Sequence, residues 1–429
     1  MSMISTPQNN QKHFSLLLLA WLAFAIIIVI APHVFSSSLA LSHLSRMGTA
    51  IVLGLSYNIL LGSSGMLSFG HAAFSGLGTF MAIHAMNFAG AELIGLPLPL
   101  VPIVGGLTGL GFAFIIGYVI TRTSGTTFAM ITLGIGQMAF ASALMFPIFF
   151  GGEGGISTNR VYGDPLFGWN FGPQIQVYYL IGTWTFICSL ACFYLMRTPL
   201  GSLFNGVRDN PERVSFIGFN PHIVRYIALM TAGLFAGIGG ALMAIDLEIA
   251  TAENLSLHQS GAVLLFTFIG GIGSFIGPII GAIVGIMLTA FLSDYTPAWQ
   301  MYLGLVFTLV VVYAPGGISS LIKPTWDVLK SALQGHHYLP LLKVVLSATA
   351  LVVGVVTTIE LAYHYGEGAV MPLQMYGLEL SSASLLTWIV TLAVLLTGML
   401  TIKKAGRALL ASLDDNISSL EVALQGSEV

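Results

Sequence analysis

Residues 14–35 read FSLLLLAWLAFAIIIVIAPHVF, a run without a single Asp, Glu, Lys or Arg. A helix needs roughly 20 apolar residues to cross the hydrocarbon core of a bilayer. Lys12 precedes the run, and the apolar core exceeds the roughly 7–15 residues of a signal peptide. We interpret the run as a first membrane span, while Ser38-Leu39-Ala40 resembles a cleavage site and keeps removal of the segment open as an alternative.

The composition of the whole chain has the same character. Of 429 residues, 56% are hydrophobic and 7% are charged, and the mean hydropathy is +0.90. An ordinary soluble domain has roughly 25% charged residues, so this chain cannot supply a polar surface. The net charge of −3 gives no basis for nucleic-acid binding, and Cys188 and Cys192 are too few for a metal site. The composition predicts an all-α polytopic membrane protein without metal or cofactor.

Twelve apolar segments are predicted to span the membrane. Two of them, 47–61 and 259–270, are short and bounded by glycine, as half-helices or members of tilted hairpins would be. Ten segments precede residue 322, and two lie in a C-terminal extension. Their approximate ranges are 14–35, 47–61, 68–88, 98–121, 127–150, 176–196, 223–245, 259–270, 277–293, 300–314, 341–363 and 383–402.

The positive charges support this layout. With the N-terminus inside and the spans alternating, twelve of the 14 Lys and Arg residues fall on the cytoplasmic side, and only Arg46 and Arg160 fall outside. Such an asymmetry is the positive-inside rule, and it predicts that both termini are cytoplasmic. Seven of the 17 acidic residues map to outer loops or outer helix ends, either as solvated loops or as a docking face for a soluble partner: Glu92, Glu153, Asp164, Asp246, Glu248, Glu253 and Asp294. The docking candidates are Glu153, Asp246, Glu248 and Glu253.

Two glycine-rich stretches, 62–78 and 261–285, interrupt predicted spans. Irregular backbone inside a membrane is tolerated where it is buried in protein or lines a cavity. His71 is an ionisable group in the first stretch, either functional or hydrogen-bonded to a neighbouring helix. The second stretch either packs helices closely or lines the translocation path. The path candidates are Ser68, Gly70, His71, Gly271 and Gly273.

The loop at 197–222 is the most organised predicted cytoplasmic segment. Leu200, Leu203, Phe204 and Val207 recur at the spacing of an amphipathic helix, and Asn210-Pro211 suits the start of a second one. A plain solvated loop that obeys the positive-inside rule is one interpretation. The other is a helix that inserts into a cytoplasmic partner.

Six segments together resemble the branched-chain amino-acid ABC transporter permeases, M-type subunit, over about residues 40–322. They occur in the family's order at 68–74 (SFGHAAF), 127–133 (TFAMITL), 151–156 (GGEGGI), 197–213 (RTPLG…RDNPER), 268–278 (FIGGIGSFIGP) and 313–318 (YAPGGI). The resemblance implies a non-catalytic ABC importer permease domain at 1–322 in the bacterial inner membrane. It also implies a second membrane subunit, two ATPase subunits and a periplasmic binding protein as partners, and a branched-chain amino acid as solute.

By the same resemblance, the 197–222 loop would couple transport to the ATPase. The coupling candidates are Gly201, Leu203, Phe204, Arg208, Asp209, Arg213 and Gly218, with Leu203, Phe204 and Val207 as an apolar ridge. The chain has no Gly-x-x-x-x-Gly-Lys-[Ser/Thr] phosphate loop, so ATP hydrolysis would belong to another polypeptide. An ion-coupled secondary transporter is the alternative, although His71 and Glu360 are the few ionisable groups it could use. A structural scaffold would not need the organised loop.

The extension at 323–429 departs from the family pattern. Two spans and a polar tail are predicted there. In the tail, Leu409, Leu413, Ile417, Leu420 and Leu424 form a helical stripe with acidic residues beside it. We expect this cytoplasmic tail either to dock on a partner or on the permease itself, or to be loosely ordered.

Overall fold

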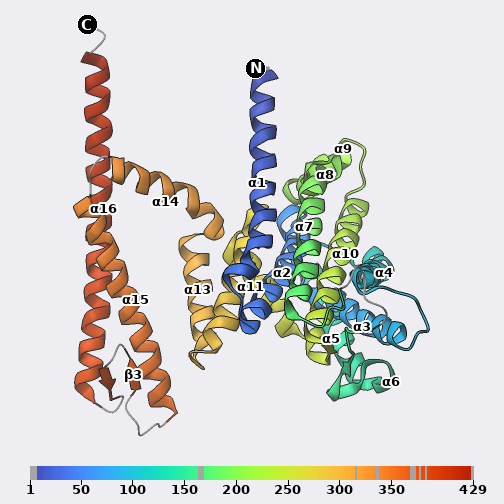
Figure 1. Cartoon of the computed structure of the whole chain (residues 1–429). Helices are drawn as coiled ribbons and strands as arrows, with labels where there is room; N and C mark the ends of the chain where they lie inside the picture. Colours follow the sequence, from blue (N-terminus) through green and yellow to red (C-terminus); the bar gives the residue numbers. More distant parts are fainter. Residues whose placement is uncertain are drawn as a thin grey trace. The chain divides into compact units, whose positions relative to one another are not determined.

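The computed structural model describes residues 7–162, 169–314, 316–334, 338–367, 373–375, 378–381 and 384–426. Over these residues the chain is almost entirely helical, which confirms the all-α fold class (Figure 1). It forms two compact units. Unit 1 comprises residues 1–291 and 306–319, and unit 2 comprises residues 292–305 and 320–429.

The first half of unit 1 consists of six helices. They are α1 (Pro7–Val34), α2 (Ser38–Asn58), α3 (His71–Gly90), α4 (Val101–Ile120), α5 (Gly125–Met145) and α6 (Pro147–Phe150). Short turns join some of them: a π-helical turn η1 (Ile59–Ser63) continues α2, and 3₁₀ turns η2 (Leu98–Leu100) and η3 (Gly152–Gly154) precede α4 and follow α6.

The second half of unit 1 also consists of helices joined by short turns. Its helices are α7 (Gln174–Arg197), α8 (Pro199–Asp209), α9 (Pro211–Phe216), α10 (Pro221–Leu247), α11 (Leu257–Gly270) and α12 (Ile276–Ile286). The turns η4 (Ala252–Leu255) and η5 (Met287–Phe291) precede α11 and follow α12. A two-residue antiparallel pair, β1 (Ile156–Ser157) with β2 (Ile249–Ala250), ties two loops together, with Ile156 opposite Ala250.

Helices α2 and α10 form the centre of unit 1. In their most apolar windows 78% and 72% of the residues are buried, against 6% in α1. Helix α10 packs on α2, α3 and α4. Its approach to α4 depends on glycine, because a Cβ on Gly109 would overlap the backbone carbonyl of Gly233. Small residues at such crossings let backbones touch, which is how membrane helices associate without a hydrophobic driving force.

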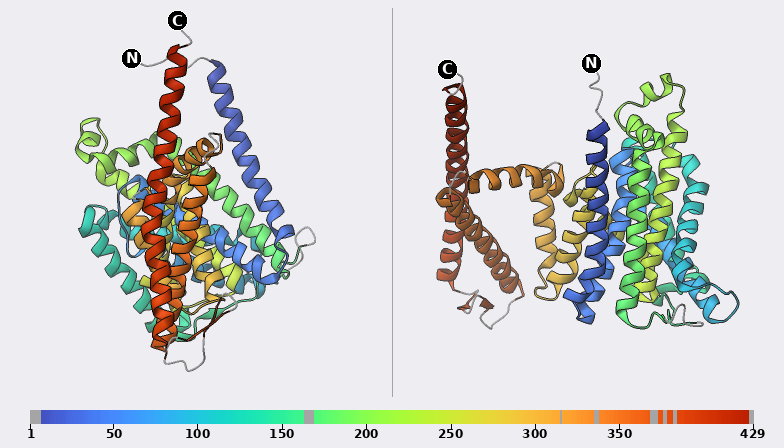
Figure 2. Two further views of the ribbon diagram at one scale, coloured as in Figure 1. Left: turned by 90° about the vertical axis from the view of Figure 1, so that its left-hand side faces the viewer. Right: turned by 45° about the horizontal axis from the view of Figure 1, so that its top comes forward.

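Each of the twelve predicted spans coincides with a helix of the structure. Eight helices of the described chain are long and apolar enough to cross a membrane, and α11, α13 and the segment Ile276–Ala290 are shorter apolar helices. The number of crossings stays a prediction. The beginning of α1 and the helices α8 and α9 lie at the same end of unit 1, as the predicted layout requires (Figures 1 and 2).

Unit 2 contains the C-terminal extension. Its elements are the first half of α13 (Trp299–Tyr313), most of α14 (Gly317–Gln334), α15 (Tyr338–Gly366), the paired strands β3 (Leu373–Met375) and β4 (Leu378–Leu380), and α16 (Leu385–Gly426). Helices α15 and α16 pack side by side. Tyr302 of α13 donates a hydrogen bond to Glu360 of α15 at 2.8 Å.

The extension contains two elements that the sequence did not predict, and a tail whose helix was predicted. Helix α14 and the β3–β4 pair were not predicted from the apolar pattern, because that pattern detects spans and not short connecting elements. The predicted tail is helical as far as Gly426. The side chains of its stripe, from residue 409 on, lie outside the described residues, and its docking role stays a prediction.

Candidate functional site

The end of unit 1 that carries α8 and α9 holds most of the predicted coupling residues. Both helices begin with a side-chain cap followed by proline, the arrangement that satisfies free N–H groups at a helix start. Thr198 accepts from the N–H of Gly201 at 3.3 Å, and Asn210 accepts from the N–H of Arg213 at 3.0 Å. The predicted pair of short helices at 197–222 is therefore present.

The apolar side chains of α8 face the chain itself. Phe204 and Val207 are 0% and 2% exposed, and Leu203 is half-buried. The expected ridge of these three residues is therefore largely used to hold α8 on unit 1, since side chains already buried cannot present an outward surface. The outward apolar surface lies at the end of α9 instead.

Phe216 and Ile217 are 87% and 62% exposed, and Phe219 is 48% exposed. We call these three residues the α9 tip. The sequence signal for it was present: three large apolar residues in a short stretch of polar loop, outside the helical stripe of α8. Beside the tip lies a hollow of about 620 Å³ between α8 and α9, whose lining includes Arg197, Leu203, Asp209, Arg213, Ile217 and Phe219.

Arg208 turns away from this surface and into unit 1. Its Nη1 donates to the backbone carbonyl of Gly62 in η1, and its Nε bonds Asp209 at 2.9 Å. Gly65 lies against the same side chain, because a Cβ there would be 2.9 Å from Cγ of Arg208. Arg208 therefore connects α8 to the first glycine-rich stretch.

The second glycine-rich stretch meets the first at the end of α2. Asn58 accepts from the N–H of Gly273 at 3.0 Å and donates to the carbonyl of Ser274 at 3.1 Å. Gly271 and Gly273 have φ of 120° and 81°, values that favour glycine, so the turn between α11 and α12 depends on them. The amide of Asn58 thus holds this turn against η1.

Ser68 and His71 are joined to the same end of α2. The hydroxyl of Tyr57 donates to the backbone carbonyl of Ser68 at 3.0 Å, and the Tyr57 and His71 rings lie 5.0 Å apart. Ser56 bonds Nε2 of His71 at 3.0 Å. Gly70 packs on α5, since a Cβ there would overlap the backbone of Thr132.

The tautomer of His71 follows from these partners. Ser56 has one hydroxyl proton, and its Oγ donates to the carbonyl of Ala232 at 2.6 Å. Nε2 of His71 is therefore the donor to Ser56, which leaves Nδ1 as an acceptor. Among the described residues, neither Nδ1 of His71 nor Oγ of Ser68 has a hydrogen-bond partner, although both atoms are buried. His71 is thus hydrogen-bonded to a neighbouring helix through Nε2, and it keeps an unpaired acceptor, Nδ1, that a functional role could use.

Three consecutive residues of α2, Ser56, Tyr57 and Asn58, therefore bind three of the five path candidates, Ser68, His71 and Gly273. We call them the α2 triplet. The candidates were predicted and the triplet was not, although Ser, Tyr and Asn in succession inside an apolar span was a visible signal. Arg213 and Gly218 are not part of this junction and lie exposed on the α9 side.

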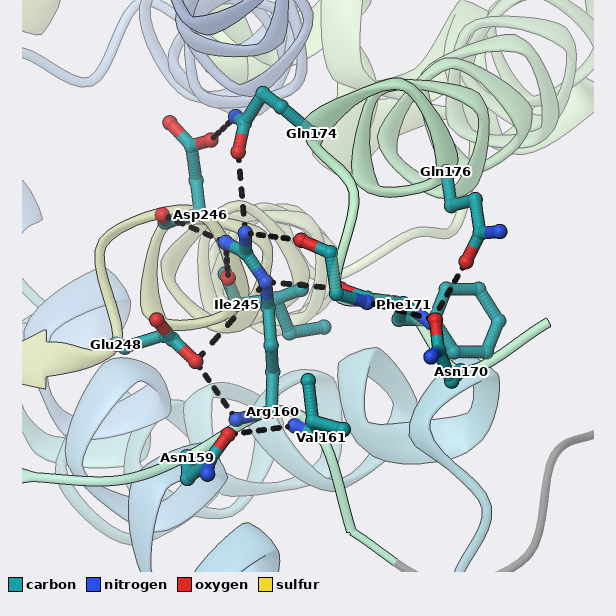
Figure 3. A network of polar contacts seen from close by, with 11 residues as sticks. Asn159, Arg160, Val161, Asn170, Phe171, Gln174, Gln176, Ile245, Asp246 and Glu248 are labelled. Atoms are coloured by element: carbon teal, nitrogen blue, oxygen red, sulfur yellow. Dashed lines mark hydrogen bonds and ion pairs between the residues drawn. The ribbon is translucent and has the colours of Figure 1, made fainter.

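Two of the predicted docking candidates, Asp246 and Glu248, lie around Arg160 (Figure 3). The Arg160 guanidinium donates to the carbonyls of Phe171 at 3.0 Å, Gly172 at 3.2 Å, Ile245 at 3.4 Å and Asp246 at 3.3 Å. It also bonds the side chain of Gln174 at 3.2 Å. This network explains why an Arg occurs on the predicted outer side: its charge is used inside the protein.

The same network engages two of the four acidic candidates. Glu248 accepts from the N–H of Arg160 at 2.8 Å, and Asp246 accepts from Gln174 at 2.9 Å. Glu153 and Glu253 are exposed. Of the four candidates, these two are the ones with freely accessible side chains.

Elsewhere in the described chain, no three His, Cys, Asp or Glu side chains are grouped as metal ligands would be. Cys188 and Cys192 are both buried and unpaired, in agreement with a packing role.

Comparison with known proteins identifies relatives of the chain. The profile of the family described as "Branched-chain amino acid transport system / permease component" matches residues 39–315. The high-affinity branched-chain amino acid transport system permease protein LivM of Escherichia coli K12 is 26% identical over 308 residues, which are 67% of this chain and 71% of LivM. No solved structure matches the chain.

Two further relatives have other names. The guanosine ABC transporter permease protein NupQ of Bacillus subtilis is 27% identical over 22% of this chain and 30% of its own length. The galactofuranose transporter permease protein YtfT of Escherichia coli K12 is 26% identical over 47% of this chain and 56% of its own length.

Proposed function

Because this chain belongs to the branched-chain amino acid transport system permease family, we propose that it carries a branched-chain amino acid and couples to its ATPase through the 197–222 loop. An ABC importer permease is non-catalytic, and ATP hydrolysis lies in a separate partner. An ATPase and a substrate-binding protein are accordingly its partners, and the bilayer is its solvent. The family favours this function over an ion-coupled transporter.

The contact of Arg208 with Gly62 is the observation that carries the coupling proposal. Arg208 belongs to α8, and Gly62 belongs to the η1 turn beside the α2 triplet. A displacement of α8 by a partner is therefore transmitted to η1, and through Asn58 to the turn at Gly273. Coupling needs an element with two discrete arrangements, and a π-helical turn next to glycines is suited to be one.

The partner surface we assign consists of the α9 tip and the hollow beside it. Phe216, Ile217 and Phe219 would be covered by the ATPase, and Arg213 and Asp209 at the rim would make charge-assisted contacts. Both termini would then lie on this cytoplasmic side. On the outer side, Glu153 and Glu253 would face the binding protein. Asp246 and Glu248 would instead hold the loop between β1 and α7 in place through Gln174 and Arg160.

The path we assign runs beside the α2 triplet, past Ser68, Gly70, His71, Gly271 and Gly273. The unpaired Nδ1 of His71 and Oγ of Ser68 support this assignment, because a buried acceptor without a donor is costly and a passing solute can supply the donor. A second, similar membrane subunit would complete the path.

A reconstituted importer with ATPase, partner permease and binding protein tests the coupling. We expect Arg208→Glu to retain the ATPase on purification but to lower solute uptake at least about tenfold per ATP hydrolysed. Arg122→Glu is the matched control, because Arg122 is exposed and its guanidinium faces the Tyr118 ring instead of η1. Normal uptake per ATP in Arg208→Glu would refute the coupling role.

Substrate choice is tested separately with the same preparation. Uptake of labelled leucine is measured in competition with isoleucine, valine, guanosine and galactofuranose. Competition by the branched-chain amino acids alone supports the proposed solute. Competition by the nucleoside or the sugar would contradict it and leave the coupling test unaffected.

A further inference from the structure

Helix α14 (Gly317–Gln334) connects two apolar helices, α13 and α15 (Figure 1). When two successive spans are joined by a connector, that connector begins and ends at the same membrane surface. A helix in this position is tied to the interface at both of its ends. Its first residues contact the turn between α11 and α12, since Ser319 Oγ lies 3.0 Å from Ser274 Oγ and Gly317 packs on Gly271. The helix from Ser320 on has no role in the path or in the coupling loop described above.

The exposed side chains of α14 include large apolar ones. Leu321, Ile322 and Trp326 are 44%, 51% and 64% exposed. Ser320 and Lys330 are also exposed. An exposed apolar group of this size on a soluble surface marks a site that something else covers.

The sequence of α14 divides by helical position into two halves. At roughly 100° per residue, the apolar residues fall in one half of the wheel and the polar ones in the other, with two exceptions: Thr325 falls among the apolar residues and Pro324 among the polar ones. The apolar half contains positions Ile318, Leu321, Ile322, Trp326, Val328, Leu329, Ala332 and Leu333. The polar half contains positions Ser319, Ser320, Lys323, Asp327, Lys330, Ser331 and Gln334.

Two features of this division match a membrane interface in particular. Trp326 falls at the boundary between the halves, and tryptophan is enriched at the level of lipid headgroups. On the helical wheel, Lys323 and Lys330 are close to this boundary, in the polar half, where they would meet headgroup phosphates. A helix that is apolar on one half and basic on the other lies in the plane of the interface.

We propose that α14 lies flat in the headgroup layer, with its apolar half against the acyl chains and with Lys323 and Lys330 on anionic lipid. The bilayer is the chosen occupant because α13 and α15 are predicted spans, which would place both ends of α14 at its surface. The helix then fixes the start of the C-terminal extension at a defined depth. This proposal is independent of the solute and of the ATPase.

Spin labels at single cysteines test the proposal in the full chain reconstituted in lipid vesicles. Cys188→Ala and Cys192→Ala remove the native thiols, both of which are buried. Labels are placed at Ile322→Cys on the apolar half and at Ser320→Cys and Lys330→Cys on the polar half. Collision rates are then measured with oxygen, which concentrates in lipid, and with a water-soluble nickel chelate.

The expected result is a reversal between the halves. Oxygen should exceed the chelate severalfold at 322, and the chelate should exceed oxygen at 320 and 330. Low collision with both reagents at 322 would show that protein covers this half, and high chelate collision at 322 would show that water does. Either outcome overturns the proposal.

A second experiment tests the proposed contact of Lys323 and Lys330 with anionic lipid. The label at 322 is measured in phosphatidylcholine vesicles and in vesicles that also contain phosphatidylglycerol. We expect a higher oxygen-to-chelate ratio with the anionic lipid, and we expect Lys323→Gln/Lys330→Gln to remove the difference. The control Lys403→Gln/Lys404→Gln, on α16, should retain it. Equal ratios in both lipids would overturn the assignment of the two lysines.

Discussion

The side chain of Asn58 binds the backbone of two consecutive residues, Gly273 and Ser274, in the turn between α11 and α12. It accepts from the N–H of Gly273 at 3.0 Å and donates to the carbonyl of Ser274 at 3.1 Å, across more than two hundred residues of sequence. One amide thus closes the contact between the two glycine-rich stretches.

Replacing Asn58 should therefore destabilise the protein. Asn58→Ala leaves a backbone donor and a backbone acceptor without partners, at a cost of about 1–3 kcal/mol for each group that stays buried. We expect a lower thermal midpoint for the detergent-purified chain. Asn87→Ala is the control. It removes a single hydrogen bond, from the Asn87 amide to the carbonyl of Ser157 at 3.2 Å, and this bond is exposed. An equal loss in both variants would argue against the role of the Asn58 amide.

The α4–α10 contact gives a sharper pair of variants. Gly109→Ala places a methyl group on the carbonyl of Gly233, whereas a Cβ on Gly111, in the same helix, has no atom within 4 Å. Overpacking of this kind costs about 1–3 kcal/mol. We expect Gly109→Ala to lower the thermal midpoint and Gly111→Ala to leave it unchanged or raise it slightly. Similar midpoints for both would mean that the two helices can separate without cost.

Arg160 should control the order of the loop that follows β1. Lysine keeps the charge but not the planar five-donor group, so Arg160→Lys cannot reproduce bonds to four carbonyls and Gln174. We expect amide exchange at residues 169–172 and 156–160 to become at least about tenfold faster, since tenfold corresponds to about 1.4 kcal/mol.

The matched control for Arg160 is Arg46→Lys, because Arg46 is the other cation predicted outside and is exposed. Exchange in the loop should stay unchanged in that variant. Unchanged exchange in Arg160→Lys as well would show that the β1–β2 pair alone holds the loop.

Replacement of Phe204 should lower the stability of the chain, whereas replacement of Phe216 should affect binding of the ATPase. Phe204 is 0% exposed, so Phe204→Ala should destabilise the isolated chain by about 3–5 kcal/mol. Phe216 is 87% exposed, so Phe216→Ala should change stability by no more than about 0.5 kcal/mol. Under the proposed function, Phe216→Ala should instead weaken retention of the ATPase on co-purification. Full retention would exclude Phe216 from that interface.

Much of the fold could be predicted because spans depend on local composition. Lipid requires each spanning helix to be apolar along its own length, and this property is visible in segments such as 14–35 without knowledge of any neighbour. Each predicted span coincides with a helix for this reason. Helix α14 was not predicted because its apolar residues are spread over one half of a helix and form no continuous run.

The site could be predicted only in part. The glycine-rich stretches and the capped loop were recognisable, since glycine, proline and Asn have local backbone effects. The α2 triplet was not found, because the functions of Ser56, Tyr57 and Asn58 depend on partners distant in sequence. Burial was also not predictable: the spacing of Phe204 indicates a helix face but does not say whether that face meets the chain itself or a partner.

The sequence alone thus determined the membrane class, the helical segments, the family resemblance and the absence of a phosphate loop, because each depends on residues close together in the chain. The tertiary structure decided which polar groups meet. It brought Arg208 to Gly62, Asn58 to Gly273 and Arg160 to Glu248, pairs separated by 146, 215 and 88 positions. Hydrogen bonds act over about 3 Å, so only the packing of distant helices can establish such pairs.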